Sequence, residues 1–428
     1  MTLPPGPRSP SLWQFLQYIL RPYPFLDGAR RRHGAPFTVR FPRHGRIVML
    51  SDPAAIKDVF TGDPHVLHSG ESNAFLGETL GENSLLVLDD EAHWRQRVPQ
   101  VPPFHGERMR AHTGAIRAAT LRRMEGWRAG GTVELEEECR GITRDVILET
   151  VFGERDEAFA GFIRGFLEKV DRPLALLGSL VPRRLRPFTP WRPIVIARRK
   201  LDAAIFSLLA RRRAAPPADD VLSLLFRMTH EDGAPLADEE LRDHLMTLLL
   251  AGHDTTAIAL GWAFEQILSH PPALARIREE VSRGLDETPY LDAAIRESHR
   301  LRPVVPLVIR LLKKPFVAGG REYPAGVHLA PCMVLAHRDP ALYPDPEAFR
   351  PERFLDKAPD PNAWFPFGGG RRRCLGMAFA LHEMRVVLAT ILSRARFELE
   401  PGRKSGVRRK GILLAPRDGV RAIVLTAS

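Results

Sequence analysis

The sequence predicts a mainly α-helical protein with a small β portion, organised as a single domain over residues 1–428. The composition, 44% hydrophobic and 26% charged, is that of an ordinary globular protein with enough apolar material for a core. Apolar residues recur with a 3.6-residue period over most of the chain up to about residue 311, which indicates helices. Residues 37–41 and 47–50 read as short strands, and residues 327–335 and 411–425 read as short strands and turns.

Composition also excludes several classes of protein. No run reaches the ~18 apolar residues of a membrane span, and the nearest candidate, residues 12–20, is too short. Prolines stand where a signal peptide would begin, so we expect no membrane anchor and no export. The net charge of +11 comes mainly from arginines spread along the chain, without a nucleic-acid-binding motif. It predicts a solvated Arg-rich surface or, alternatively, a patch facing an acidic protein.

Two proline-rich segments, 182–193 and 211–220, interrupt the helical pattern and are expected to be loops. The longest helix should begin at Asp238 and end before Pro271. About 32 residues correspond to roughly 48 Å, so this helix should cross the core. Its middle, Ala-Gly-His-Asp-Thr-Thr at 251–256, contains poor helix formers, and a threonine hydroxyl there can bond the carbonyl of residue i−4. We expect a local widening with polar groups exposed; a tolerated irregularity is the alternative.

One of the three cysteines lies between a Gly/Arg loop and an amphipathic helix. Cys374 sits near the helix N-terminus beside arginines 371–373, and both features favour a thiolate. Glycines in the loop let a flat ligand approach the backbone, so this cysteine suits an axial ligand for haem iron. A surface loop with a half-buried free thiol is the alternative. Cys139 and Cys332 offer neither a metal pair nor a disulfide framework, and Cys139 should be inert core.

The cysteine segment fills the pattern F-x-x-G-x-R-x-C-x-G and thereby resembles the haem-thiolate monooxygenases of the cytochrome P450 superfamily. Residues 251–256 are similar to the oxygen-binding motif of that superfamily, on the same long central helix over the haem. The resemblance implies that Cys374 ligates iron, that Thr255 orients protons and water during oxygen activation, and that Asp254 relays protons from solvent. The neighbouring His253 occupies a variable position and is not expected to be a ligand.

Further motifs follow in the family's order, and their roles are implied by the resemblance. An E-x-x-R motif and an F-x-P-x-R-F segment imply a network of Glu297, Arg300 and Arg353 that supports the cysteine loop. Haem b would be held non-covalently, with four residues around its propionates. Many relatives have a second basic residue after the position of Arg97, whereas Val98-Pro99 follows it in this sequence. The helix geometry at this position therefore stays open. The expected propionate ligands are His93, Arg97, Arg310 and Arg372, and the expected haem-pocket residues are Ala251, Gly252, Phe367, Gly368 and Gly376.

The implied reaction is insertion of one oxygen atom from O2 into a C–H bond of a hydrophobic small molecule, such as a fatty acid, terpenoid or polyketide. The chain contains no flavin, dinucleotide or iron–sulfur motif, so electrons should come from NAD(P)H through a ferredoxin reductase and an acidic ferredoxin. A bacterial, cytoplasmic and monomeric enzyme is expected. The family positions that line the substrate pocket correspond to Leu86, Leu248, Val304, Val305, Leu307 and Ile412.

Two alternatives compete with this reading. The first is a haem-thiolate protein that does not use O2, either a peroxide-driven hydroxylase or an isomerase; the Asp254–Thr255 pair argues against it because those branches typically lack the pair. The second is a haem-binding sensor or carrier, which would need no proton relay and would show no NAD(P)H-dependent turnover. A reduced, CO-bound absorption spectrum separates thiolate ligation from histidine ligation.

Overall fold

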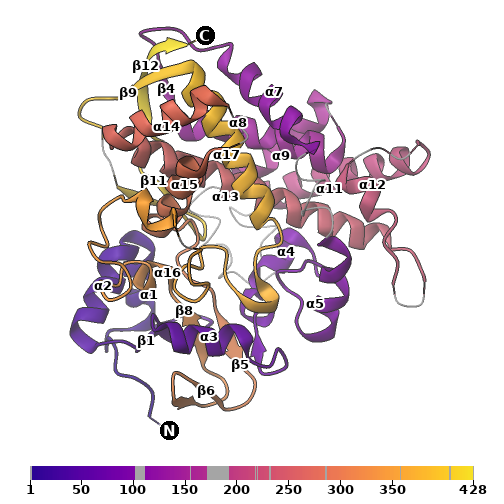
Figure 1. Cartoon of the computed structure of the whole chain (residues 1–428). Coiled ribbons are helices and arrows are strands. Elements are labelled where there is room, and N and C mark those ends of the chain that lie inside the picture. Colours follow the sequence, from indigo (N-terminus) through magenta and orange to yellow (C-terminus); the bar gives the residue numbers. More distant parts are fainter. Residues whose placement is uncertain are drawn as a thin grey trace.

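The computed structural model describes residues 2–101, 111–154, 156–170, 192–216, 218, 220–230, 233–284, 287–356, 358–403 and 406–427. Helices dominate, as predicted (Figure 1). The helices are α1 (Ser11–Leu20), α2 (Pro22–His33), α3 (Pro53–Thr61), α4 (Gly77–Leu80), α5 (Asp90–Arg97), α7 (Thr113–Met124), α8 (Leu135–Ile147), α9 (Glu157–Val170), α11 (Arg192–Arg213), α12 (Val221–Leu225), α13 (Asp238–Leu268), α14 (Pro271–Arg283), α15 (Pro289–Leu301), α16 (Met333–Ala336) and α17 (Met377–Arg394).

The β portion forms four small sheets. The largest has the order β1-β2-β8-β5-β3, and its β2–β8 pair is parallel while its other pairs are antiparallel. The others are β4-β12-β9, the hairpin β10-β11 and the hairpin β6-β7. The strands are β1 (Phe37–Phe41), β2 (Gly45–Leu50), β3 (Leu67–His68), β4 (Thr132–Glu134), β5 (Arg310–Leu312), β6 (Phe316–Ala318), β7 (Arg321–Tyr323), β8 (His328–Pro331), β9 (Ala395–Leu399), β10 (Val407–Lys410), β11 (Leu413–Pro416) and β12 (Arg421–Ala427).

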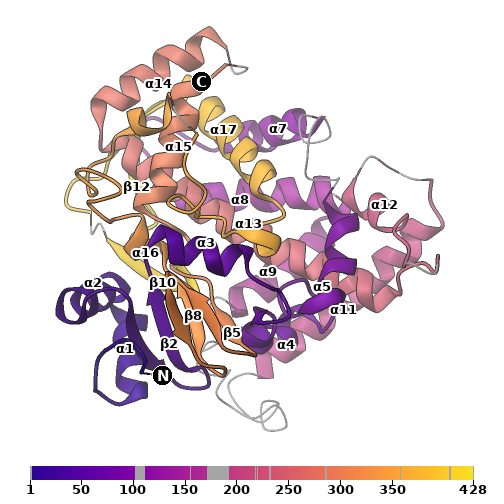
Figure 2. The ribbon, with the colours of Figure 1, turned by 60° about the horizontal axis from the view of Figure 1, so that its bottom comes forward.

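Helix α13 is the predicted long helix, and it runs unbroken for 31 residues through the middle of the molecule. Glu240 accepts a hydrogen bond from the N–H of Ala237 at 2.9 Å, which satisfies one of the free donors at the helix start. The helix packs against α8, α15 and α17, and together these helices bury the largest apolar cluster. Figure 2 shows the β-rich side, with α1 and α2, lying beside this helical part.

Several predicted boundaries were wrong by a few residues. The segment 327–335, expected to contain short strands and turns, holds β8 up to Pro331 and then the short helix α16, because a short apolar run alone does not distinguish helix from strand. The loop expected at 211–220 begins one turn late, since α11 continues to Arg213. Most of the segment 182–193 lies outside the described residues. Within the described part of the chain, no helix is long and apolar enough to cross a membrane.

Candidate haem and oxygen-activation site

The cysteine loop is shaped by close packing against α3. Cys374 N donates to the carbonyl of Phe367 at 2.9 Å, which closes the loop. Gly370 has a φ of +63°, and a Cβ at this position would lie 1.8 Å from the carbonyl oxygen of Phe60. No other residue fits there without moving α3. A Cβ on Gly376, by contrast, would meet no described atom within 4 Å, so the loop faces open space on that side.

The Cys374 side chain is accessible to solvent, yet it lies within the molecule. Burial raises the pKa of its thiol above the ordinary value, although the Gly376 N–H and the guanidinium groups of Arg97 and Arg373 act in the opposite direction. An accessible atom that is surrounded by protein faces an internal space rather than the outer surface. The prediction that nearby arginines favour the thiolate is therefore only partly right, because burial outweighs them. The charge of a coordinated metal would stabilise the thiolate.

The four predicted propionate ligands lie close together. Burial lowers the pKa of His93 to about 3, with Arg372, Arg97 and Arg310 contributing in that order. Burial likewise lowers the pKa of Arg310 to about 10, and Arg372 adds to the effect. Such mutual repulsion indicates a buried excess of positive charge. An anionic group placed there would relieve it.

Arg372 also has protein partners that the sequence did not reveal. Its guanidinium donates to the carbonyls of Leu85 and Leu88 and to Asp89, which lies 2.5 Å away. Asp89 in turn accepts three backbone N–H groups from residues 69–71. Arg372 therefore ties the cysteine loop to the segment before α5.

Helix α13 has one accessible stripe in an otherwise buried middle. Leu248, Ala251, Gly252 and Thr255 are accessible, whereas their neighbours from His253 onwards are mostly buried. Their spacing of i, i+3, i+4 and i+7 places them on one face of the helix. As predicted, the Thr255 hydroxyl donates to the carbonyl of Ala251, at 2.5 Å, but the helix remains continuous. A central helix with an accessible stripe indicates an internal space along that face.

Asp254 lies beside the stripe and is held by cations. Its Oδ1 accepts from Lys410 Nζ at 2.8 Å and from Arg140 Nε at 3.1 Å, and the His253 ring lies at 3.4 Å. Burial alone would raise the pKa of Asp254, but His253, Lys410 and Arg140 together hold it well below its usual range. The carboxylate is therefore charged at neutral pH. Its cation partners come from β10 and α8, and neither was identified from the sequence.

The charged network continues from Asp254 towards the surface. Glu136 is fully buried and accepts from Arg140 at 2.6 Å and from Arg408 at 2.7 Å. Arg140 also donates to Glu137, whose side chain is half exposed. A chain of hydrogen-bonded charged groups thus runs from the exposed end of α8 to the middle of α13. Lys410 is one of three cations in the strand Val-Arg-Arg-Lys, so nothing in its local sequence distinguishes it as the partner of Asp254.

The predicted supporting network is present as a set of contacts. Arg300 and Glu297 are fully buried and form two hydrogen bonds, of 2.7 and 2.8 Å. Arg353 lies 3.4 Å from the same carboxylate. Arg300 also donates to the carbonyls of His337 and Pro346, so it joins α15 to the segment that precedes the cysteine loop.

The residues predicted to line a substrate pocket differ in burial. Val304 is buried in the main apolar cluster, and Leu307 packs with the cluster beneath β1 and β2. Leu86 and Ile412 are exposed, Ile412 at the turn of the β10–β11 hairpin. Only Leu248, on the accessible stripe, shares a face with the predicted oxygen-activation residues.

The comparisons with known proteins agree with this geometry. The family model for cytochrome P450 matches residues 3–420. The chain is 39% identical to cytochrome P450 135B1 of Mycobacterium tuberculosis, over 98% of this chain and 91% of that protein. It is 36% identical to cytochrome P450 138 of the same species, over 99% and 96% of the two chains. The retinoic acid-bound cyanobacterial CYP120A1 has the same fold, with a TM-score of 0.88, 26% identity and coverage of 99% and 100%.

The fold and the matches define a haem-thiolate oxidoreductase. The chain belongs to the cytochrome P450 family, whose members are monooxygenases that bind haem through a cysteine thiolate and use O2 and redox partners. The residues described above fit such a group. A flat, anionic cofactor needs a ligand for its metal, positive charge for its acidic groups and space for its ring. The Cys374 thiol, the arginines around His93 and the accessible stripe on α13 would provide these three.

Proposed function

We propose that this enzyme is a ferredoxin-dependent monooxygenase that holds haem b between α13 and the cysteine loop, with Cys374 as the axial ligand. The observation that carries the proposal is the Cys374 thiol, which is accessible from inside the molecule and lies near Arg97. Haem, when bound, supplies the oxidising chemistry that inserts one oxygen atom from O2 into a C–H bond while the other leaves as water. His93, Arg97 and Arg310 would hold its propionates, with Arg372 fixing the loop beside them.

The chain's own residues supply the protons. The Thr255 hydroxyl lies on the accessible stripe, where it can orient a donor towards the reacting oxygen. Asp254, held ionised by Lys410 and Arg140, is the end of the charged network that reaches the exposed part of α8. Because the Arg140 guanidinium does not release its proton, we infer that the network positions the Asp254 carboxylate, and that Asp254 relays protons from solvent to the hydroxyl. The apolar neighbourhood of Leu248 favours a hydrophobic substrate, such as a fatty acid, terpenoid or polyketide.

Replacing Cys374 by serine or histidine tests the axial ligand. Neither side chain gives iron a thiolate, so the red-shifted Soret band of the reduced, CO-bound protein should disappear. The same substitution at Cys139, which is fully buried, leaves the band in place if the protein folds. A Cys374 variant that keeps the band would overturn the proposal.

Replacing Thr255 by alanine tests proton delivery. Substrate and haem should still bind, but peroxide released per NADPH consumed should rise because the hydroxyl serves proton transfer rather than binding. Asp254→Asn should slow turnover more than it raises peroxide. Full coupling in the Thr255 variant would show that the hydroxyl has no such role. Product formed without NADPH would favour a peroxide-driven or isomerase activity instead.

The redox partner is proposed to dock beside the cysteine loop. Arg371 and Arg373 are exposed there, and Arg371 lies over the ring of Trp94 at 5.0 Å, next to exposed Arg95. Among the described residues, no carboxylate forms an ion pair with these three arginines. Arg108 and Arg110, two further candidates, lie outside the described residues. An acidic ferredoxin would complement this surface.

Stopped-flow reduction by an acidic ferredoxin over a salt series tests the docking surface. Arg371→Glu with Arg373→Glu should reduce the rate at low salt by tenfold or more. The matched control is Arg31→Glu with Arg32→Glu, two exposed arginines on α2, which changes the net charge equally but leaves the proposed surface intact. Equal rates in both double variants would contradict docking at the cysteine loop.

A further inference from the structure

Helix α1 presents apolar side chains to solvent. Leu12 is 53% exposed, Trp13 55% and Leu20 74%, and Leu16 between them is partly exposed. Residues 12, 16 and 20 are spaced by four, so they form one stripe along the helix, with Trp13 beside it. This stripe is part of a ten-residue helix that lies at the edge of the molecule, next to α2 (Figures 1 and 2).

The orientation of α1 is set by specific contacts. Gln14 is fully buried; its amide donates to the carbonyls of Pro7 and Ser9 at 3.0 and 2.7 Å and accepts from the N–H of Arg40 at 2.9 Å. Tyr18, on the same face, stacks on Phe41 with ring centroids 4.9 Å apart. The helix thus keeps a polar glutamine inside and leaves its leucines and tryptophan outside. Rotating the helix to hide the stripe would break all of these contacts.

The first fifty residues, which contain this helix, carry much of the net positive charge of the sequence. Residues 1–50 contain eight arginines and no lysine, with Asp27 as their only acidic residue, so eight minus one gives +7 of the total of +11. Arg8 and Arg21, at the two ends of α1, are exposed. Arg40 donates to the carbonyls of Arg8 and Ser9, and it lies opposite exposed Arg46 in the β1–β2 pair. The apolar stripe is therefore bordered by cationic side chains.

We propose that the α1 face, consisting of Leu12, Trp13, Leu16 and Leu20 with the flanking arginines, binds the surface of an anionic phospholipid bilayer. Leucine and tryptophan side chains insert at the boundary between headgroups and acyl chains, and arginines bind the lipid phosphates. Apolar side chains along one stripe of a helix with arginines at its borders are the arrangement of a helix that lies in the interface of an anionic membrane. The combination of the two features therefore favours lipid.

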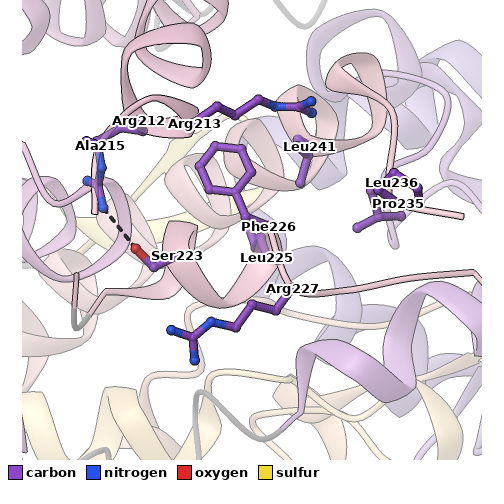
Figure 3. A pocket seen from close by; sticks show the side chains of 10 residues that line it. All are labelled: Arg212, Arg213, Ala215, Ser223, Leu225, Phe226, Arg227, Pro235, Leu236 and Leu241. Carbon is purple, nitrogen blue, oxygen red and sulfur yellow. Dashed lines mark hydrogen bonds between the residues drawn. The ribbon is translucent and has the colours of Figure 1, made fainter. Parts of the chain in front are cut away.

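This surface is separate from the one proposed for the redox partner. In Figures 1 and 2, α1 and α2 lie at one edge of the molecule, away from α5, which carries Trp94 and Arg95. The protein could consequently rest on a membrane and still accept electrons. A hollow lined by Arg212, Arg213 and Phe226 (Figure 3) lies at α11 and α12 and plays no part in this proposal.

Co-sedimentation of the haem-loaded enzyme with vesicles tests the proposal. Vesicles of phosphatidylglycerol and phosphatidylcholine should bind the wild-type protein, and binding should weaken at least tenfold in 0.5 M salt or with pure phosphatidylcholine. Leu12→Gln, Trp13→Gln and Leu20→Gln together should weaken binding to the mixed vesicles at least tenfold. The matched control replaces two equally exposed apolar residues elsewhere, Val317→Gln with Leu425→Gln, and should bind like the wild type.

A stability control accompanies the binding assay, and three contrary outcomes would overturn the proposal. Because the three side chains are exposed, the triple variant should keep the wild-type melting temperature and the red-shifted reduced-CO band, which shows that any loss of binding is local. Failure of the wild type to bind anionic vesicles, or equal binding by the triple variant, contradicts lipid docking. If the wild type instead self-associates in light scattering and the triple variant does not, the face is a contact between two copies of the chain.

Discussion

Glutamine in place of Glu383 should change how the stability of the protein depends on pH. Glu383 lies on α17 and is 2% exposed, and its Oε1 has no hydrogen-bond partner among the described residues. Burial raises the pKa of this carboxyl from its ordinary value to about 8. The neutral acid is therefore the favoured form in the folded protein. Because the folded pKa is raised, stability is highest below the unfolded pKa of about 4.5 and is lost as pH rises towards 8.

The size of this effect follows from the two pKa values. Each unit of difference corresponds to about 1.4 kcal/mol, and between pH 5 and pH 7.5 only the unfolded chain releases its proton to a large extent. Wild-type protein should thus lose about 3 kcal/mol of unfolding free energy over this interval through Glu383 alone. The Glu383→Gln variant cannot ionise, so its advantage over the wild type should grow by the same amount.

Denaturant unfolding of both haem-loaded proteins at a series of pH values measures this difference. Taking the difference between variant and wild type removes the contributions of all other titrating groups and any fixed cost of the amide. Glu157→Gln, at a side chain that is 87% exposed, is the matched control and should give a difference that does not vary with pH. A pH-independent difference for Glu383→Gln would refute the reasoning that the carboxyl is buried without a partner.

Three further substitutions test the site. Lys410→Met removes a cation from Asp254 and should lower the unfolding free energy by about 1–3 kcal/mol, with Lys410→Arg restoring most of it; an unchanged denaturation midpoint would contradict the ion pair. Arg300→Leu leaves the buried carboxylate of Glu297 without its partner and should cost about 3–5 kcal/mol, measured in the same way. Gly370→Ala places a Cβ against the backbone of α3 at a positive φ, which should displace the cysteine loop. The amount of haem bound per protein molecule should therefore fall, and an unchanged haem content would argue against tight packing of the loop.

Local features of the site could be predicted from the sequence, because they depend on residues a few positions apart. The bond from Thr255 to the carbonyl of Ala251 is one that a threonine within a helix can make to the residue four positions earlier. The pairing of Glu297 with Arg300 across one turn is of the same kind. The predicted long helix was also right, since a periodic pattern over 31 residues is a strong signal.

Contacts between distant segments could not be predicted. Lys410 reaches Asp254 across 156 positions, and neither segment alone contains a pattern that indicates the other. The three protein partners of Arg372 within residues 85–89 are of the same kind. The outward stripe of α1 was missed because both faces of that helix are apolar, so periodicity cannot say which face is buried; the contacts of Gln14 decide it.

The β10–β11 hairpin is attached to the rest of the protein at several points along its strands, but not at its turn. Lys410 is joined to Asp254, the Leu414 carbonyl accepts from the indole of Trp262 at 2.8 Å, and the Leu414 N–H donates to the carbonyl of Val304 at 2.8 Å. The turn residue Ile412 is 40% exposed. The contacts that hold the strands do not involve the Ile412 side chain. Side chains of different size can therefore replace Ile412 without disturbing the charged network around Asp254.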